Sequence, residues 1–188
     1  INEILFESTD YIPEFIEIYN NSSKIIDLKS FIFALTDNFS GNIKSSIALS
    51  DNQLLIFPGN YFVFTQSTQL LKSSFTNCVG SNLFEPETWM TLPNDGGTLQ
   101  LLNSEGKIID MAIFNTGMHF SLLTETPGIS LERISSYKPA NKTDSWHSAS
   151  EASGYATPTL INSQNQNLSE LQSCFTIEPN EVSPDNDG

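Results

Sequence analysis

Two short segments near the start of the chain alternate in side-chain character with a period of two. Residues 1–6 read Ile-Asn-Glu-Ile-Leu-Phe, and residues 14–20 read Glu-Phe-Ile-Glu-Ile-Tyr-Asn. Between them, Ser-Thr-Asp at residues 8–10 favours a turn. A period of two is the repeat of a β-strand, because successive side chains point to opposite faces. The chain therefore predicts an antiparallel sheet at its start.

Short apolar runs divided by turn residues continue from this sheet to residue 161. The runs at 98–102 and 107–114 flank a turn in which Gly106 suits the left-handed position, so they predict a hairpin. The runs at 54–57 and 61–65 enclose Pro-Gly-Asn, which predicts either a hairpin or a sharp corner. This pattern is typical of an all-β antiparallel sandwich.

Composition divides the chain into one domain and a tail. We expect a β-sandwich domain over residues 1–174, with long loop insertions near 67–93 and 115–127. A short helix near 69–74 is the one helical element that the pattern supports. Residues 175–188 have the Pro, Asn and acidic makeup of a linker to a following domain. We therefore interpret the chain as a part of a longer protein.

The alternating faces also predict which side chains form the core. Thirteen phenylalanines and 38% hydrophobic residues are enough to build a core without a metal or a disulfide. We expect fifteen side chains to be buried: Ile4, Phe6, Phe15, Ile18, Phe31, Phe33, Ile56, Phe62, Phe64, Leu99, Leu101, Ile109, Ile113, Leu131 and Trp146.

The charge balance disfavours two classes of partner. The chain has 22 acidic and 8 basic residues, and Arg133 is its single arginine. Because nucleic-acid affinity rests on lysine and arginine neutralising phosphates, we expect no nucleic-acid binding. The same charge disfavours anionic membranes, and no apolar run reaches the roughly 18 to 20 residues that span a bilayer. We expect no membrane insertion.

Four residues raise the question of a cross-link or a metal. Cys78 and Cys174 either form a disulfide that closes a long loop or remain independent buried thiols, and the sequence leaves both open. Asp185 and Asp187, in Asp-Asn-Asp-Gly, resemble the first half of a calcium loop, where alternate oxygen ligands and a glycine surround the ion. We therefore name calcium as the one candidate cofactor.

Catalytic chemistry has weak support in the chain. No metalloprotease, nucleophile-elbow or phosphate-loop motif is present in the sequence, and there are two histidines, His119 and His147. An enzymatic reading requires both histidines close together at one end of the sandwich, with acidic residues around a metal. We predict a non-catalytic protein.

Two further groups of residues give hypotheses of their own. Trp146, His147 and Tyr155 form a candidate binding site, because aromatic faces stack on sugars; packing of Trp146 over the end of the sandwich is the alternative. Glu17 lies in an apolar strand, so if its face is buried it requires a partner, for which we consider Arg133 or a nearby lysine.

Several short segments carry a family resemblance by their identity and order. The most specific are Asn-Glu-Ile at 2–4, Phe-Ile-Glu-Ile-Tyr-Asn at 15–20, Ile-Asp-Leu at 26–28, Ser-Leu-Glu-Arg-Ile at 130–134 and Trp-His-Ser-Ala at 146–149. With 92–97, 99–103 and 107–110 they span residues 1–162. Together they resemble the lamin-tail domain in its bacterial form, an immunoglobulin-like β-sandwich.

The resemblance implies a module of a larger protein and supplies no catalytic residues. Bacterial members of this type occur in secreted or surface multidomain proteins, and we expect a Bacteroidetes-type envelope or exported protein as the setting. The resemblance therefore implies export to the periplasm, the cell surface or the medium. Our hypothesis is a non-catalytic binding or spacer module, whose partners are the flanking domains of its own chain and a protein or glycan at the cell surface. The alternatives are a calcium-stabilised adhesion or carbohydrate-binding module, or an accessory domain of a secreted metal-dependent hydrolase.

Overall fold

A computed structural model describes residues 1–37 and 40–166. It contains twelve strands, one α-helix and four 3₁₀ turns in the described residues. The strands are β1 Glu3–Leu5, β2 Phe15–Tyr19, β3 Ile26–Asp27, β4 Ile32–Thr36, β5 Ile43–Ala48, β6 Leu55–Ile56, β7 Tyr61–Thr65, β8 Leu83–Phe84, β9 Gly97–Leu102, β10 Ile108–Phe114, β11 Leu131–Arg133 and β12 Trp146–Ser148. The helix is α1 Thr68–Ser74, and the 3₁₀ turns are η1 Gly80–Asn82, η2 Thr116–Met118, η3 Thr143–Ser145 and η4 Glu151–Ser153.

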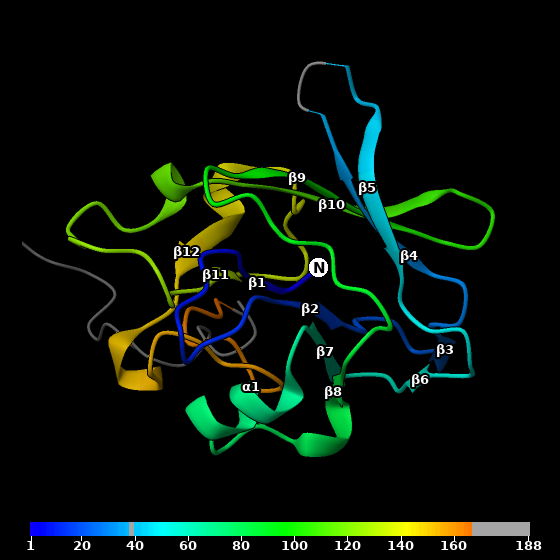
Figure 1. Ribbon diagram of the computed structural model, residues 1–188, viewed down its shortest axis with the longest axis horizontal. Coiled ribbons are helices and arrows are strands. Elements are labelled where there is room, and N and C mark those ends of the chain that lie inside the picture. The colour runs from blue at the N-terminus through cyan, green and yellow to red at the C-terminus, as the bar shows by residue number, and fades with distance from the viewer. Residues whose placement is uncertain (38–39, 167–188) are drawn as a thin grey trace, which may run out of the picture.

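Two sheets face each other to form an immunoglobulin-like sandwich (Figure 1). The larger sheet has the strand order β12-β11-β1-β2-β7-β8, and the smaller has the order β10-β9-β4-β5. A separate pair, β3 and β6, lies at one end. All pairings are antiparallel except that of β7 with β8. The predicted all-β sandwich is confirmed.

The predicted local elements mostly form where the pattern places them. β1 pairs with β2, and β9 pairs with β10 around a turn in which Gly106 has a φ of 75°. The run at 54–57 leads into the small β3–β6 pair while 61–65 enters the large sheet, so the connection is a corner and not a hairpin. α1 confirms the helix expected near 69–74, although the same insertion also carries β8 as a parallel edge strand.

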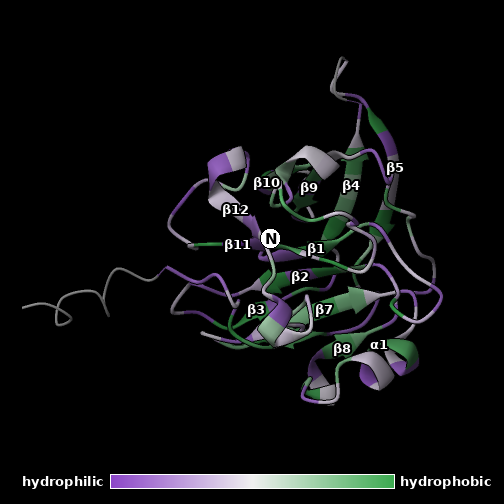
Figure 2. Cartoon of the chain, turned by 90° about the vertical axis from the view of Figure 1, so that its left-hand side faces the viewer, coloured by the Kyte–Doolittle hydropathy of each residue, from purple (hydrophilic) through white to green (hydrophobic). Residues whose placement is uncertain are grey.

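The space between the sheets is filled by aromatic and aliphatic side chains. Phe33 and Phe64, from opposite sheets, are fully buried and meet edge to face with their ring centroids 5.5 Å apart. Figure 2 shows the hydrophobic character of β4, which lies at the centre of the smaller sheet. Twelve of the fifteen predicted core residues are buried, and Phe31 is partly buried against them.

Two of the core predictions are wrong, both on β10. Ile109 and Ile113 are 51% and 36% exposed. An irregularity in the pairing with β9 between Ile108 and Asp110 resets the alternation, so that Ala112 and Phe114 face the core instead. A one-residue shift of this kind exchanges the two faces of a strand.

The outer face of the larger sheet is also covered, by two different elements. α1 lies over one half, where Leu71 packs with Phe15 and Val63. Residues 155–166, the strap, run over the other half, where Gln166 N–H donates to the Ile134 carbonyl at 2.7 Å. The strap follows β12, a three-residue strand that sequence analysis missed because it is too short to show a period.

Candidate functional site

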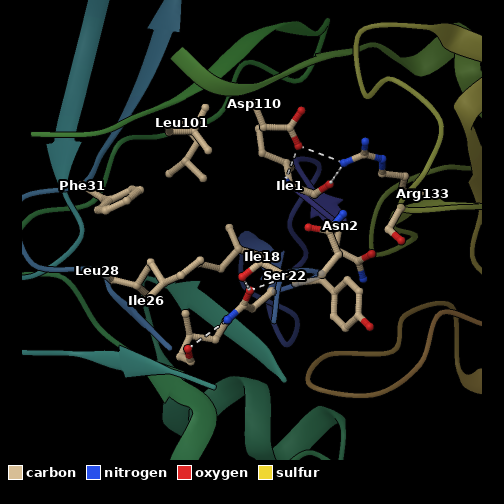
Figure 3. A pocket seen from close by; sticks show the side chains of 16 residues that line it. Ile1, Asn2, Ile18, Ser22, Ile26, Leu28, Phe31, Leu101, Asp110 and Arg133 are labelled. Atoms are coloured by element: carbon tan, nitrogen blue, oxygen red, sulfur yellow. Dashed lines mark hydrogen bonds and ion pairs between the residues drawn. The ribbon is translucent and has the colours of Figure 1, made fainter. Parts of the chain in front are cut away.

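A pocket of about 350 Å³ opens at the end of the sandwich where the two sheets and the β3–β6 pair meet (Figure 3). Apolar side chains from five strands and the β3–β4 connection form its walls: Ile18, Ile26, Leu28, Phe31, Ile56, Leu101 and Ile109. Pockets of this volume with mostly apolar walls are the usual form of a small-ligand site. It is therefore the first candidate for a binding site.

One side of the pocket carries an ion pair between Asp110 and Arg133 (Figure 3). Arg133 Nη1 lies 2.9 Å from Asp110 Oδ2 and donates to the Ile1 carbonyl at 3.0 Å, while Nε and Nη2 donate to the Lys138 carbonyl. Burial disfavours the charged form of Asp110, but the Ile1 nitrogen, 2.7 Å away, and Arg133 outweigh it, so the pKa of this carboxyl is lowered. The charged groups of Asp110 and Arg133 therefore already have partners within the protein.

The opposite side of the pocket is formed by the turn after β2. Asn20 Nδ2 donates to the carbonyls of Lys24 and Ile56, and its Oδ1 accepts hydrogen bonds from the backbone N–H and hydroxyl of Ser22. All of these distances lie between 2.7 and 3.1 Å. Because the Asn20 amide has internal partners at both ends, it holds the turn in place and leaves the apolar walls as the open surface of the pocket.

The predicted binding residues are only partly brought together. His147 and Tyr155 line a second pocket, of about 340 Å³, together with Phe120, whose ring stacks with that of His147 at a centroid distance of 5.9 Å. Trp146 instead points into the core, 5% exposed, and its Nε1 donates to the Ala140 carbonyl at 2.7 Å. Phe120 was missed because it lies in a polar loop with no periodic pattern.

The two histidines lie on different sides of β12 and have different surroundings. His119 is buried against Phe6, and its Nδ1 lies 3.0 Å from Ser148 Oγ, whereas His147 is exposed. Burial lowers the pKa of His119 to about 4. In the described residues, His119 Nε2 has no hydrogen-bond partner, and no group of three or more His, Cys, Asp or Glu side chains is placed to hold a metal ion.

A row of three fully buried glutamates crosses the outer face of the larger sheet beneath the strap. Glu3 of β1 lies opposite Glu17 of β2 on one side and Glu132 of β11 on the other. Arg133 does not pair with Glu17, so that prediction is wrong, because its side chain reaches Asp110 instead. Glu17 accepts hydrogen bonds from Asn2 Nδ2 and from the Thr159 backbone N–H, at 2.8 and 2.6 Å.

Burial and mutual repulsion raise the pKa of two of these glutamates, Glu3 and Glu17. Burial and the neighbouring Glu132 raise the pKa of Glu3 to about 8. Burial and Glu3 raise the pKa of Glu17 well above its ordinary value. The period of two predicts on which face of their strands Glu3 and Glu17 lie. It cannot show that the strap covers this face.

Three predicted residues cannot be placed. Asp185, Asp187 and Cys174 lie outside the described residues, so the calcium site and the disulfide with Cys78 stay predictions. Cys78 itself is half-buried after α1. No helix in the described ranges is long and apolar enough to cross a membrane.

The fold places the chain in the class of immunoglobulin-like β-sandwich modules. More specifically, it belongs to the Lamin Tail Domain family, whose family model matches residues 1–116, and such domains are generally non-catalytic. No curated protein and no solved structure matches the chain. The match ends before β11, although β11 pairs directly with β1 in the middle of the larger sheet.

Proposed function

We propose that this chain is a non-catalytic binding module of a larger exported or cell-surface bacterial protein, and that its end pocket holds an apolar group of a partner. The observation that carries this proposal is the contrast within the pocket. Asp110, Arg133 and Asn20 are bonded to other groups of the protein, while the aliphatic walls stay open. Water in an apolar cavity finds few hydrogen-bond partners, so transfer of an apolar group from water into the cavity is favourable.

The proposed occupant is an aliphatic or aromatic side chain, presented by a flanking domain or by another surface protein. Such a group would bury its area against Phe31 and Ile109, which are still partly exposed, beside Leu28 and Ile56, which are each 2% exposed and already fixed in the core. Fixed walls reduce the entropy cost of binding. A pure spacer role would leave the pocket without an occupant, so a measurement of ligand binding distinguishes the binding module from the spacer.

Binding of a neutral hydrophobic dye, N-phenyl-1-naphthylamine, tests the proposal by fluorescence. Ile109→Lys places a charge at the pocket, whereas Ile113→Lys places the same charge on the same strand outside it. We expect the first variant to weaken dye binding by about tenfold or more and the second to leave it unchanged. No dye binding, or equal losses in both variants, would favour the spacer reading.

The second pocket supports a carbohydrate-binding role as another candidate. The stacked rings of Phe120 and His147, with Tyr155 in the same pocket, present aromatic surface beside the polar side chains of Glu151 and Gln164. A glycan microarray followed by titration calorimetry tests it. Phe120→Ala should abolish any glycan binding, while Tyr137→Ala, which removes an exposed aromatic ring that does not line this pocket, should not.

A further inference from the structure

The strap and the glutamate row are matched as a set of donors and a set of acceptors. Thr157 N–H donates to Glu3 Oε1 at 2.9 Å, and Thr159 N–H donates to Glu17 Oε2 at 2.6 Å. Further along, Gln164 N–H and the Ser163 hydroxyl both donate to Glu132 Oε2, at 2.9 and 2.8 Å. Each glutamate therefore has its own contact on the strap. Together these contacts cover the row from one end to the other.

The hydroxyl groups around Glu3 show that the row must hold protons. Thr157 Oγ1 lies 3.2 Å from Glu3 Oε2 and 2.7 Å from Glu132 Oε1, yet it has one hydrogen to donate. Ser130 Oγ lies 2.5 Å from Glu3 Oε1 and 3.3 Å from the Tyr155 carbonyl, so its one hydrogen is better placed for Glu3. A single proton on Glu3 Oε2 satisfies both Thr157 contacts, because Oε2 then donates to Thr157 Oγ1, which donates to Glu132, while Oε1 accepts from Ser130 Oγ and the Thr157 N–H.

No ion pair in the described part of the chain involves the row. The ion pairs there join Asp110 to Arg133 and to the Ile1 nitrogen, and Asp37 to Lys44. Beyond the glutamates, three titratable groups lie around the row. The Ile1 ammonium interacts with Glu17, although its nitrogen is bonded to Asp110. His147 lies opposite Glu132 on β12, and Tyr61 lies on β7, where burial and Glu17 raise its pKa. The neighbours opposite Glu17 and beyond it, Val63 and Leu83, are apolar.

We propose that residues 155–166 form a proton-dependent latch, which is closed over the larger sheet while Glu3 and Glu17 hold their protons and opens when they ionise. Three adjacent carboxylates on neighbouring strands, about 5 Å apart, repel one another strongly in a dry environment. A buried charge without a counter-charge is costly, and access to water removes most of that cost. Undocking of the strap provides this access.

The strap is the element that should move, because the sheet beneath it is held from its other face. Ile4, Ile16 and Leu131 on the same three strands point into the core and are fully buried. Their packing does not depend on protonation, so β1, β2 and β11 keep their places when the strap leaves. In the strap, Ala156 packs with the cluster under α1 and Pro158 is buried, whereas the larger apolar side chains Leu160 and Ile161 are exposed.

Hydrogen exchange measured by mass spectrometry tests the latch on the full chain. Protection factors, which correct for the intrinsic pH dependence of exchange, are compared for residues 155–166 and for β4 and β9 at about pH 6 and pH 9. We expect protection of the strap to fall by about tenfold or more at the higher pH while protection of β4 and β9 is maintained. Equal protection of the strap at both values, or loss in all segments together, would overturn the proposal.

Glu3→Gln removes the central titrating group while preserving the hydrogen bonds. The amide oxygen accepts from Ser130 Oγ and Thr157 N–H, and the amide nitrogen donates to Thr157 Oγ1, which then donates to Glu132. This variant should keep the strap protected at about pH 9. Glu105→Gln, in the exposed β9–β10 turn, is the matched control and should behave as the wild type. An unchanged pH dependence in Glu3→Gln would contradict the latch.

Discussion

Two regions of this domain are equally inaccessible to water but are held in different ways. Between the sheets, Phe33 and Phe64 are fully buried among other apolar side chains. On the outer face of the larger sheet, Glu3 and Glu17 are just as buried, beneath the strap. The first region gains free energy from the area that it removes from water. The second gains its free energy from hydrogen bonds, each of which needs a particular donor and a particular protonation state.

The contrast explains why the acids lie outside the sandwich. A carboxyl group between the sheets would face only side chains, whereas on the outer face it meets the backbone N–H groups of an irregular segment. Thr157 and Thr159 supply these donors because neither nitrogen is used in a strand ladder. The strap therefore supplies hydrogen-bond donors to the carboxyl groups, and the carboxyl groups supply acceptors to backbone N–H groups of the strap. The core should respond to changes in volume, and the row to changes in proton concentration.

Removal of a core ring should give the largest effect. Phe33→Ala deletes a fully buried ring that meets Phe64, and we expect it to lower the free energy of unfolding by about 3 to 5 kcal/mol. Urea denaturation at about pH 5 and pH 8 should give the same loss at both values. Phe57→Ala, at a ring that is 49% exposed, is the control. A wild-type urea midpoint in Phe33→Ala would show that Phe33 is not part of the core.

The pH dependence of the wild type should distinguish the row from the core. The pKa of Glu3 is about 8 in the folded protein and near 4.5 when it is exposed, so between these values the folded state binds more protons than the unfolded state. Stability is therefore fully present below about pH 4.5 and is lost as the pH rises towards 8, by about 2 to 4 kcal/mol. Urea titrations across this range measure the loss. A stability that rises with pH would contradict the buried row.

A smaller effect is expected from a single hydroxyl of the strap. Thr157→Val keeps the shape and the backbone N–H but removes the group that bonds both Glu3 and Glu132. Two buried carboxyl oxygens lose this partner, so we expect a loss of about 1 to 3 kcal/mol in thermal or urea unfolding. Thr143→Val, at an exposed position, should stay near the wild type. An equal result for both variants would show that the strap is held by its backbone contacts alone.

Periodicity was sufficient to predict the sandwich but not the parts that depend on pairing. The β1–β2 and β9–β10 hairpins could be predicted because alternation and turn residues are local signals. The errors at Ile109 and Ile113 come from the irregular pairing with β9, which the alternation of one strand does not reveal. β8 and β12 are too short to show a period, so their presence depends on neighbouring strands.

The candidate sites were less predictable, because each is assembled from distant segments. The end pocket joins residues from Ile1 to Ser136, and no motif connects them. The glutamate row needs two strand registers at once, with Glu3 and Glu132 separated by most of the chain. The sequence indicated that Glu17 would need a partner if buried. It could not indicate that protons and backbone donors would take the place of a cation.

The smallest effect, with the opposite sign, is expected from His119. Its pKa is about 4 in the folded protein and near 6.5 when exposed, so between these values the unfolded state binds more protons. Stability from the neutral ring is fully present above about pH 6.5 and is lost as the pH falls towards 4, by about 1 to 2 kcal/mol. Because this trend opposes those of Glu3 and Glu17, the wild-type profile should be less steep between pH 4.5 and 6.5 than between pH 6.5 and 8.

Comparison of two asparagine variants isolates the contribution of the buried ring. His119→Asn keeps a polar atom near Ser148 Oγ but does not titrate, so its stability should rise more steeply than the wild type on acidification from pH 6.5 to 4.5. His147→Asn changes an exposed ring and should leave the profile as it is. Urea unfolding of both variants across this range measures the difference. Identical profiles would mean that the pKa of His119 is the same in the folded and unfolded states. The pH dependence of stability would then come from the buried glutamates alone.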